Sequence, residues 1–175
     1  MPINIEIKAS CARPAWVEDK LLDLGARFEG TDHQIDTYFK VEKGRLKLRE
    51  GNIENNLIYY QRSDREGPKQ SDFFLQPVEQ DSPLKEMLTQ GLGVEVVVDK
   101  SRKIFFIDNV KFHIDEVKGL GGFVEIEASD LDSPRSPEEL RQQCFHYLHE
   151  LGIREEELQA LSYSDLILEK SHNHV

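Results

Sequence analysis

The most constraining feature of this sequence is a period-two alternation of apolar and charged residues along successive short segments. Residues 3–8 read Ile-Asn-Ile-Glu-Ile-Lys, and the same alternation returns at 45–49 and at 123–128. Neighbouring side chains of a β-strand point to opposite faces. Each of these segments is therefore predicted to be a strand with one apolar face and one charged face.

The order of the predicted elements favours an antiparallel α+β fold. The predicted strands are 3–9, 27–41, 45–49, 57–62, 72–78, 94–108, 110–117 and 123–128. The predicted helices begin at Pro14, at Pro83 with Ser82 as its N-cap, near Ser136, and over 155–169. Because the strands follow one another without a helix between each pair, an antiparallel sheet or barrel is favoured over a doubly wound parallel sheet.

Length and charge limit the classes of function. The chain has 175 residues, so one domain over residues 1–170 is expected, with a disordered tail at 171–175. A net charge of −11 argues against a nucleic-acid polymer as partner. No segment has the roughly 20 apolar residues of a membrane helix, and the two cysteines have no metal-ligand spacing. A cytoplasmic protein with no membrane partner is the expectation.

The charged strand faces divide into two groups by sign. The acidic group consists of Glu6, Asp115, Glu125 and Glu127. The basic group consists of Lys8, Arg45, Lys47, Arg49, Arg62, Lys100 and Arg102. Like charges stacked on one face destabilise a strand pair unless a counterion lies between them.

Two structures account for this pattern. In the first, the charged face of a half-exposed sheet points into water. In the second, the sheet closes into a barrel whose lumen is the charged face, and helices cover the apolar outside. Crowded carboxylates then require a cation such as Mg²⁺ or Mn²⁺, and the cationic group suits a polyphosphate. A metal–triphosphate complex would satisfy both groups at once.

Three weaker features are interpreted as structural. Asp36 and Tyr38 share one strand face and are candidates for a nucleoside pocket, although a packing role near the strand end is favoured for both. His113 shares a face with Asp115, but a lone histidine is more often structural than functional. Residues 119–122 are rich in glycine yet precede no Lys-Ser/Thr and no helix, so they are interpreted as a turn.

Several motifs resemble the CYTH superfamily, which includes class IV adenylyl cyclases, thiamine triphosphatases and inorganic triphosphatases. Asn4-Ile5-Glu6-Ile7-Lys8 is similar to the family's Glu-x-Glu-x-Lys signature. The resemblance continues in the family's order through 36–39, 45–49, 57–62, 100–102, 115–117 and 120–127, and ends at Ser162-Tyr163-Ser164-Asp165-Leu166. The motifs after residue 115 are most similar to the cyclase-like branch. The resemblance implies an eight-stranded antiparallel β-barrel, a triphosphate tunnel with a charged lumen, flanked by helices.

The resemblance also implies roles for single residues. Metal binding is expected of Glu6, Asp115, Glu125 and Glu127, with Mg²⁺ or Mn²⁺ as cofactor. Phosphate contacts are expected of Lys8, Arg45, Lys47, Arg49, Arg62, Lys100 and Arg102, with Glu6 and Lys8 as the catalytic residues. One departure is Asn4, which replaces the first glutamate of the signature and brings an oxygen without a charge.

The leading functional hypothesis is a metal-dependent adenylyl cyclase that converts ATP into cyclic AMP and pyrophosphate. The alternatives are a triphosphatase acting on tripolyphosphate, thiamine triphosphate or a nucleoside triphosphate, and a non-catalytic protein that binds polyphosphates or nucleotides. The partner in each case is a small-molecule triphosphate. Because members of the cyclase branch are often dimeric, the resemblance is also compatible with a homodimer.

Overall fold

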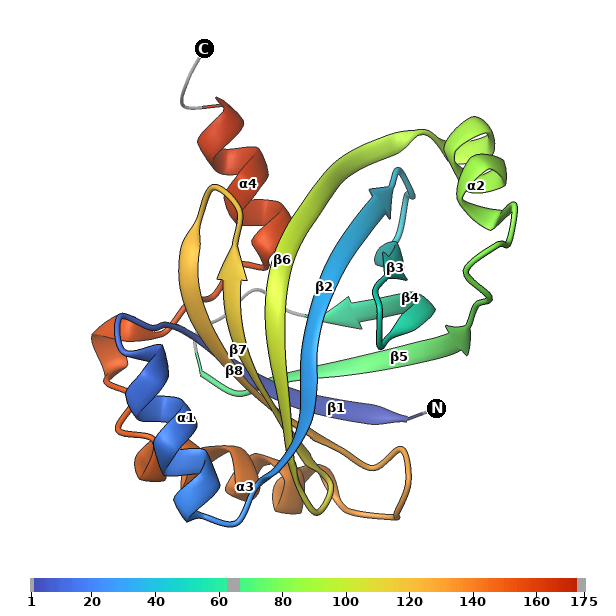
Figure 1. The fold of residues 1–175 in the computed structure, drawn as a ribbon. Helices are drawn as coiled ribbons and strands as arrows, with labels where there is room; N and C mark the ends of the chain where they lie inside the picture. The colour runs from blue at the N-terminus through green and yellow to red at the C-terminus, as the bar shows by residue number, and fades with distance from the viewer. Residues whose placement is uncertain (1, 63–66, 173–175) are drawn as a thin grey trace.

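The computed structural model describes residues 2–62 and 67–172, and its eight antiparallel strands close into a barrel (Figure 1). Neighbouring strands follow the order β1, β5, β4, β3, β2, β6, β7, β8, and β1 closes the circle by pairing with both β5 and β8. The predicted eight-stranded antiparallel barrel is confirmed. The strands are β1 Ile3–Ser10, β2 Arg27–Phe39, β3 Arg45–Glu50, β4 Asn55–Arg62, β5 Lys69–Pro77, β6 Val94–Ile107, β7 Val110–Val117 and β8 Gly121–Ser129.

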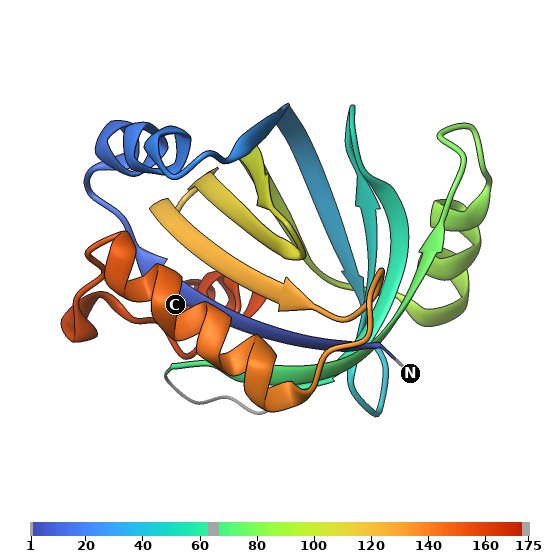
Figure 2. The same cartoon turned by 90° about the horizontal axis from the view of Figure 1, so that it is seen from below.

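Four α-helices flank the barrel within the described part of the chain. They are α1 Pro14–Asp23, α2 Leu84–Leu92, α3 Pro137–Glu150 and α4 Tyr163–His172, with a 3₁₀ turn at Glu155–Glu157 before α4. Figure 2 shows α1 and α3 on the side formed by β1, β7 and β8, with α2 on the opposite side. No helix among the described residues has the length and apolar character needed to span a membrane.

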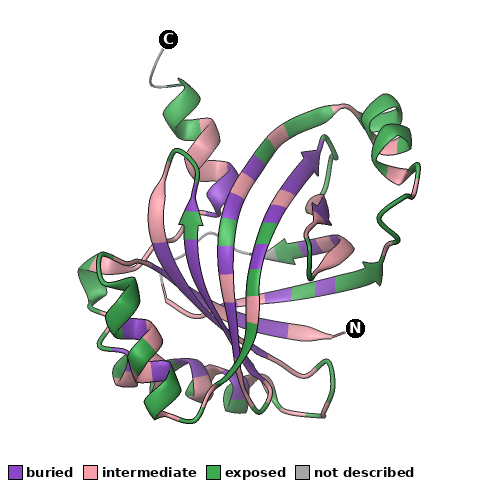
Figure 3. Cartoon of the chain, viewed as in Figure 1, coloured by how far each residue is buried: buried purple, intermediate pink, exposed green. Residues whose placement is uncertain are grey.

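The main hydrophobic core lies outside the barrel, between the sheet and helices α1 and α3. Ile5 and Ile7 of β1 point outward and are at most 1% exposed, and they pack with Leu21 of α1 and with Leu140 and Cys144 of α3. Figure 3 shows that β7 and β8 are buried over most of their length. The alternation of the sequence therefore places apolar residues under the helices and charged residues in the lumen, where they too are removed from water.

Helices α1 and α3 begin where the sequence predicts, whereas α2 and α4 differ from the prediction. Ser136 caps α3 as predicted, because its hydroxyl accepts from the Glu139 N–H while the Glu139 carboxylate accepts from the Ser136 N–H. Helix α2 has Pro83 as its N-cap instead of Ser82. The Ser82 hydroxyl still accepts a hydrogen bond from the Leu84 N–H. The helix predicted over 155–169 is divided into the 3₁₀ turn and α4.

The predicted disordered tail overlaps helix α4, which continues through His172. Its first two residues, 171 and 172, are therefore helical, and the rest of that prediction, 173–175, lies outside the described residues.

The turn between β3 and β4 is fixed by Asp32 of β2, which is fully buried. Its carboxylate accepts the backbone N–H groups of Asn52, Ile53 and Glu54 at 2.7, 2.9 and 2.9 Å. Gly51 leaves room for this contact, because a Cβ there would lie 2.6 Å from an Asp32 oxygen. The turn is thereby held against the barrel, and Glu54 reaches the lumen.

We expect Asp32→Asn to lower the free energy of unfolding by about 2–4 kcal/mol, because an amide NH₂ replaces an acceptor oxygen and leaves a buried N–H unpaired. Urea unfolding measures the change. The control is Asp99→Asn on β6, where the carboxylate is half-exposed and pairs with exposed His33. The control should change stability by less than about 1 kcal/mol. Equal losses in both variants would contradict the role of Asp32.

Candidate active site

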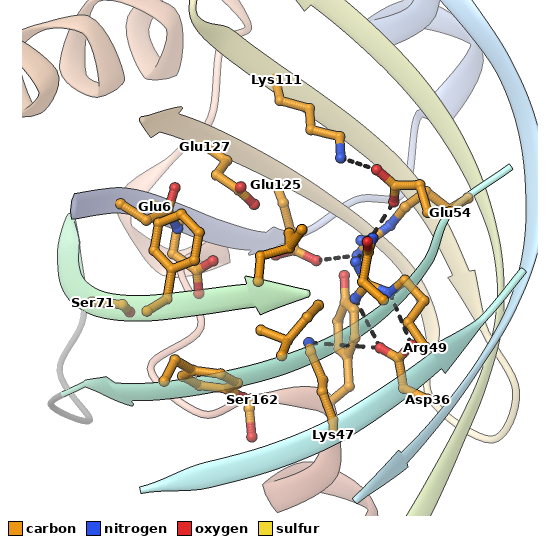
Figure 4. Close-up of a pocket in the computed structure, with 18 of the residues that line it drawn as sticks. Glu6, Asp36, Lys47, Arg49, Glu54, Ser71, Lys111, Glu125, Glu127 and Ser162 are labelled. Atoms are coloured by element: carbon orange, nitrogen blue, oxygen red, sulfur yellow. Dashed lines mark hydrogen bonds and ion pairs between the residues drawn. The ribbon is translucent and has the colours of Figure 1, made fainter. Parts of the chain in front are cut away.

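The charged inner faces of the strands meet in one cavity inside the barrel (Figure 4). The cavity holds about 850 Å³ of empty space, its open mouth included. In this view Glu6, Glu125 and Glu127 lie toward one side, and Lys47 and Arg49 lie toward the other, next to Asp36 and Glu54. The sequence-predicted site residues that line this cavity are Glu6, Lys8, Lys47, Arg49, Lys100, Arg102, Glu125 and Glu127.

The cations of β3 and β6 converge on Asp36 of β2. Arg49 donates two hydrogen bonds to its carboxylate at 2.9 Å each, and Lys100 donates a third at 2.7 Å. Lys47 completes the group, with its ammonium 3.6 Å from the same carboxylate. The packing role assigned to Asp36 from sequence is therefore wrong: it is the common counterion of three buried or half-buried cations.

The electrostatics of this cluster follow from burial and proximity. Burial alone would raise the pKa of Asp36, but Arg49, Lys100 and Lys47 outweigh it and hold that pKa well below its usual value. Burial lowers the pKa of Lys100 to about 7, with Arg102, Arg49 and Lys47 acting in the same direction and Asp36 opposing them. Three cations around one carboxylate leave positive charge in excess, which suits an anionic ligand.

Arg102 of β6 connects the basic and acidic sides of the lumen. Its guanidinium donates to both oxygens of Asp115 at 2.8 and 2.7 Å and to Glu125 at 2.8 Å. The Tyr163 hydroxyl of α4 also donates to Asp115 at 2.7 Å. The division by sign seen in the sequence is thus incomplete in space, because buried charges require partners of the opposite sign.

Two of the predicted site residues whose side chains the structure describes, Asp115 and Arg45, do not line the cavity. Asp115 is buried behind Arg102, with both oxygens engaged. Arg45 points to α4, where it donates two hydrogen bonds to Asp165 at 2.7 and 2.9 Å. Arg62 ends β4, and its side chain lies outside the described residues.

The remaining carboxylates form a crowded group on β1 and β8. Glu6 is the direct cross-strand partner of Glu127, and Glu125 lies two residues away on the same face. Burial raises the pKa of Glu127, and the charges of Glu6 and Glu125 add to the shift while Lys111 opposes it. Neighbouring carboxylates disfavour the ionised form of one another, and a bound divalent cation would remove this repulsion. Mg²⁺ and Mn²⁺ bind oxygen ligands of this kind.

A second cluster, His113, Asp115 and Glu125, places its ligand atoms within 4.8 Å of one another. His113 is 2% exposed, and neither ring nitrogen has a hydrogen-bond partner among the described residues. Burial and the nearby Arg102 hold its pKa well below the usual value, so the ring is neutral. Arg102 already donates hydrogen bonds to both carboxylates of this cluster. Its guanidinium therefore supplies the positive charge that a metal ion would otherwise provide there.

Sequence reasoning missed Glu54 and Lys111, which form an ion pair across the lumen. Glu54 also accepts from Gln34 at 2.8 Å and lies 3.6 Å from Arg49. Burial would raise its pKa, but Lys111 and Arg49 lower it to about 2. Lys111 lies on the same face of β7 as His113, so the alternation of side chains along this strand would have predicted that it faces the lumen. Glu54 lies just before β4 in a turn, where no such alternation exists.

The chain therefore has the architecture of a closed antiparallel barrel that gathers buried cations and carboxylates around one cavity. The sequence matches the CYTH domain family over residues 2–163. This chain belongs to the CYTH domain family.

Several solved structures of other proteins have a similar fold. The PH1012 protein of Pyrococcus horikoshii OT3 is 26% identical, with 93% of this chain and 98% of that chain covered and a TM-score of 0.77. A proposed adenylate cyclase of Vibrio parahaemolyticus is 15% identical, with coverage of 94% and 97% and a TM-score of 0.75. A proposed adenylyl cyclase of Hippeastrum, for which a dominant triphosphatase activity is described, is 16% identical, with coverage of 98% and 96% and a TM-score of 0.61. Comparison with curated protein sequences gave no match.

The lowered pKa of Lys100 predicts that anion affinity depends on pH. A bound polyanion favours the charged ammonium, so binding above pH 7 requires uptake of a proton. We expect the affinity for inorganic tripolyphosphate, measured by calorimetry without metal, to fall between pH 7 and 9 by up to about tenfold per unit. Lys100→Arg keeps its charge and should show a shallower dependence, while the ionisation of the ligand affects both proteins equally. Identical slopes would contradict this assignment.

Proposed function

We propose that this protein is a divalent-metal-dependent enzyme that cleaves a triphosphate inside the barrel. The observation that carries the proposal is the joint enclosure of two opposite groups in one cavity: the cations around Asp36 and the carboxylates Glu6, Glu125 and Glu127. Neither group alone requires a substrate. Together they match a ligand that is strongly anionic and carries a divalent cation.

The basic residues bind and orient the phosphates in this proposal. Arg49 and Lys100 are already held in place by Asp36, so little side-chain freedom is lost when an anion binds. Lys8 lies beside Glu125 in the strand register, and its ammonium is 4.3 Å from the centre of the Tyr163 ring. Lys8 adds positive charge at the border between the cationic side and the acidic side of the lumen.

The acidic residues would hold Mg²⁺ or Mn²⁺. We assign this role to Glu6, Glu125 and Glu127, and we assign Asp115 to positioning Arg102, since its oxygens face the guanidinium. When bound, the ion supplies Lewis-acid stabilisation of charge that develops on phosphoryl oxygens. Asn4 follows the same strand face as Glu6 and brings no charge to this group.

We rank cyclisation of ATP first among the reactions this site would catalyse. The 3′-oxygen of the ribose forms a bond to the α-phosphorus, the bond to the leaving pyrophosphate breaks, and the hydroxyl proton is lost to solvent or a carboxylate. Hydrolysis of a terminal phosphate by water is the second candidate. The proposed adenylyl cyclase of Hippeastrum shares the fold and has a dominant triphosphatase activity, which supports hydrolysis as the second candidate.

A product screen separates the two reactions. Purified protein is incubated with ATP, inorganic tripolyphosphate and thiamine triphosphate, each with Mg²⁺ and with Mn²⁺, and products are resolved by chromatography. Cyclisation predicts cyclic AMP and pyrophosphate in equal amounts from ATP. Orthophosphate as the sole phosphate product would replace the cyclase proposal with the triphosphatase. Tight binding without turnover under either metal would reject the enzyme proposal as a whole.

Removal of one central carboxylate should abolish metal-dependent turnover. We expect Glu127→Gln to lower kcat/KM by on the order of 10²-fold or more, since loss of metal-based charge stabilisation costs several kcal/mol of the barrier. The matched control is Glu116→Gln, an exposed glutamate of β7. Chelation by EDTA should remove the activity, and added Mg²⁺ or Mn²⁺ should restore it. A fully active Glu127→Gln variant would refute the proposed metal site.

A further inference from the structure

The aromatic ring of Tyr163, the first residue of α4, lies within reach of two cations of the lumen. Tyr163 is 5% exposed and lines the cavity, whereas α4 itself packs beside β6 (Figure 1). The ammonium groups of Lys8 and Lys100 lie 4.3 and 5.8 Å from the centre of the ring. These lysines come from β1 and β6, so the first turn of α4 connects two distant strands inside the barrel.

An aromatic ring holds an ammonium group in a different way from a carboxylate. The electron-rich face of the ring attracts the cation, but the ring has no net charge and does not neutralise it. For Lys100 the neutralising carboxylate is Asp36, at 2.7 Å. The Tyr163 ring therefore restricts where the two ammonium groups lie without reducing the positive charge that an anionic ligand requires.

The hydroxyl of the same side chain reaches the acidic part of the lumen. It donates a hydrogen bond to Asp115 at 2.7 Å, and the Asp115 carboxylate also accepts from Arg102. Arg102 donates in turn to Glu125 at 2.8 Å. Burial and the charges of Asp115 and Glu125 hold the pKa of Tyr163 well above its usual value, so the hydroxyl keeps the proton that it donates.

Contacts on both sides of Tyr163 fix its position. Arg45 of β3 donates two hydrogen bonds to Asp165, which lies two residues further along α4. The Tyr163 ring also packs against the ring of Phe123 in β8, with the two centroids 5.0 Å apart. The turn of α4 that carries Tyr163 is thus anchored to the barrel, and the ring has little freedom to leave the lumen.

We propose that Tyr163 is a positioning residue for both halves of the site. Its ring holds the ammonium groups of Lys8 and Lys100 where phosphates bind. Its hydroxyl fixes Asp115 and Arg102, and through them the carboxylate of Glu125 where the divalent cation binds. The inference rests on the proposed function, because it takes the places of the phosphates and the cation from it, and it adds a role for α4.

Two substitutions separate the ring from the hydroxyl. Tyr163→Phe removes the hydroxyl and keeps the ring, and Tyr163→Leu removes both. The matched controls are Tyr147→Phe and Tyr147→Leu in α3, where the tyrosine ring packs against Phe112 in the core outside the barrel. Calorimetry on the full chain measures the affinity for inorganic tripolyphosphate without metal and, separately, the affinity for Mn²⁺ without polyphosphate. Urea unfolding establishes that each variant is folded.

We expect Tyr163→Phe to weaken Mn²⁺ binding by about tenfold, the lower end of the range for a lost outer-sphere partner of a metal ligand. Its affinity for tripolyphosphate should stay unchanged, because the ring remains. Tyr163→Leu should weaken Mn²⁺ binding to the same extent and also weaken tripolyphosphate binding by about tenfold, since buried contacts between the ring and the cations are lost. The Tyr147 variants should leave both affinities unchanged.

A double-mutant cycle with Lys8→Met separates positioning from a general loss of structure. If the ring acts through Lys8, Tyr163→Leu should weaken tripolyphosphate binding by less than about threefold in the Lys8→Met protein. The same tenfold loss with and without Lys8 would overturn the role of the ring. Tyr163→Met, with a flexible side chain that fills irregular spaces, replaces Tyr163→Leu in the cycle if the latter does not fold.

The remaining outcomes separate this inference from the proposed function. Unchanged Mn²⁺ affinity in Tyr163→Phe would overturn the role of the hydroxyl, and unchanged tripolyphosphate affinity in Tyr163→Leu would overturn the role of the ring. Both results leave the proposed function intact. If the unmodified protein binds neither probe, the proposed function fails as well, and if it binds only one probe, the half of the inference that concerns the other is overturned.

Discussion

Closure of the barrel places charged side chains where water cannot solvate them, and the pairing of these buried charges governs the rest of the structure. Asp36 is 1% exposed and accepts from Arg49 and Lys100, and Arg102 is 3% exposed between two carboxylates. Each pair offsets part of the cost of removing its ions from water. Breaking one partner would leave the other buried and uncompensated, so the inner surface is fixed in one arrangement before any ligand binds.

The compensation within the lumen is incomplete at two places, and those places are where a ligand is expected. Three cations share Asp36, so positive charge remains in excess on β3 and β6. Glu6, Glu125 and Glu127 crowd on β1 and β8, where burial and mutual repulsion raise the pKa of Glu127. Phosphates and a divalent cation would each meet the surface that suits its chemistry.

Much of this was predictable from the sequence because strand parity depends only on the alternation of side chains. Glu6 and Lys8 face the lumen, while Ile5 and Ile7 lie on the opposite face of the same strand, under the helices. The alternation predicts which face of a strand a side chain occupies, but not how far along the barrel axis it lies. Arg45 shares the predicted face of β3 with Lys47 and Arg49, yet it reaches α4 and pairs there with Asp165.

The features that the sequence did not give depend on contacts between distant segments. The sequence predicts a packing role for Asp36 and not its ion pairs. Its three cations come from β3 and β6, and they converge on Asp36 only because the sheet closes. Glu54 reaches the lumen only because Asp32, on another strand, binds the backbone of its turn. No local pattern in the sequence reports either contact.

A crystal structure with Mn²⁺ and a triphosphate that resists cleavage tests the central claim most directly. The account predicts an anomalous manganese peak at the carboxylates of Glu6 and Glu127, with phosphate oxygens in contact with Lys47, Arg49 or Lys100 in the same lumen. A triphosphate bound on the outer surface, or manganese bound only at sites remote from both glutamates, would contradict it.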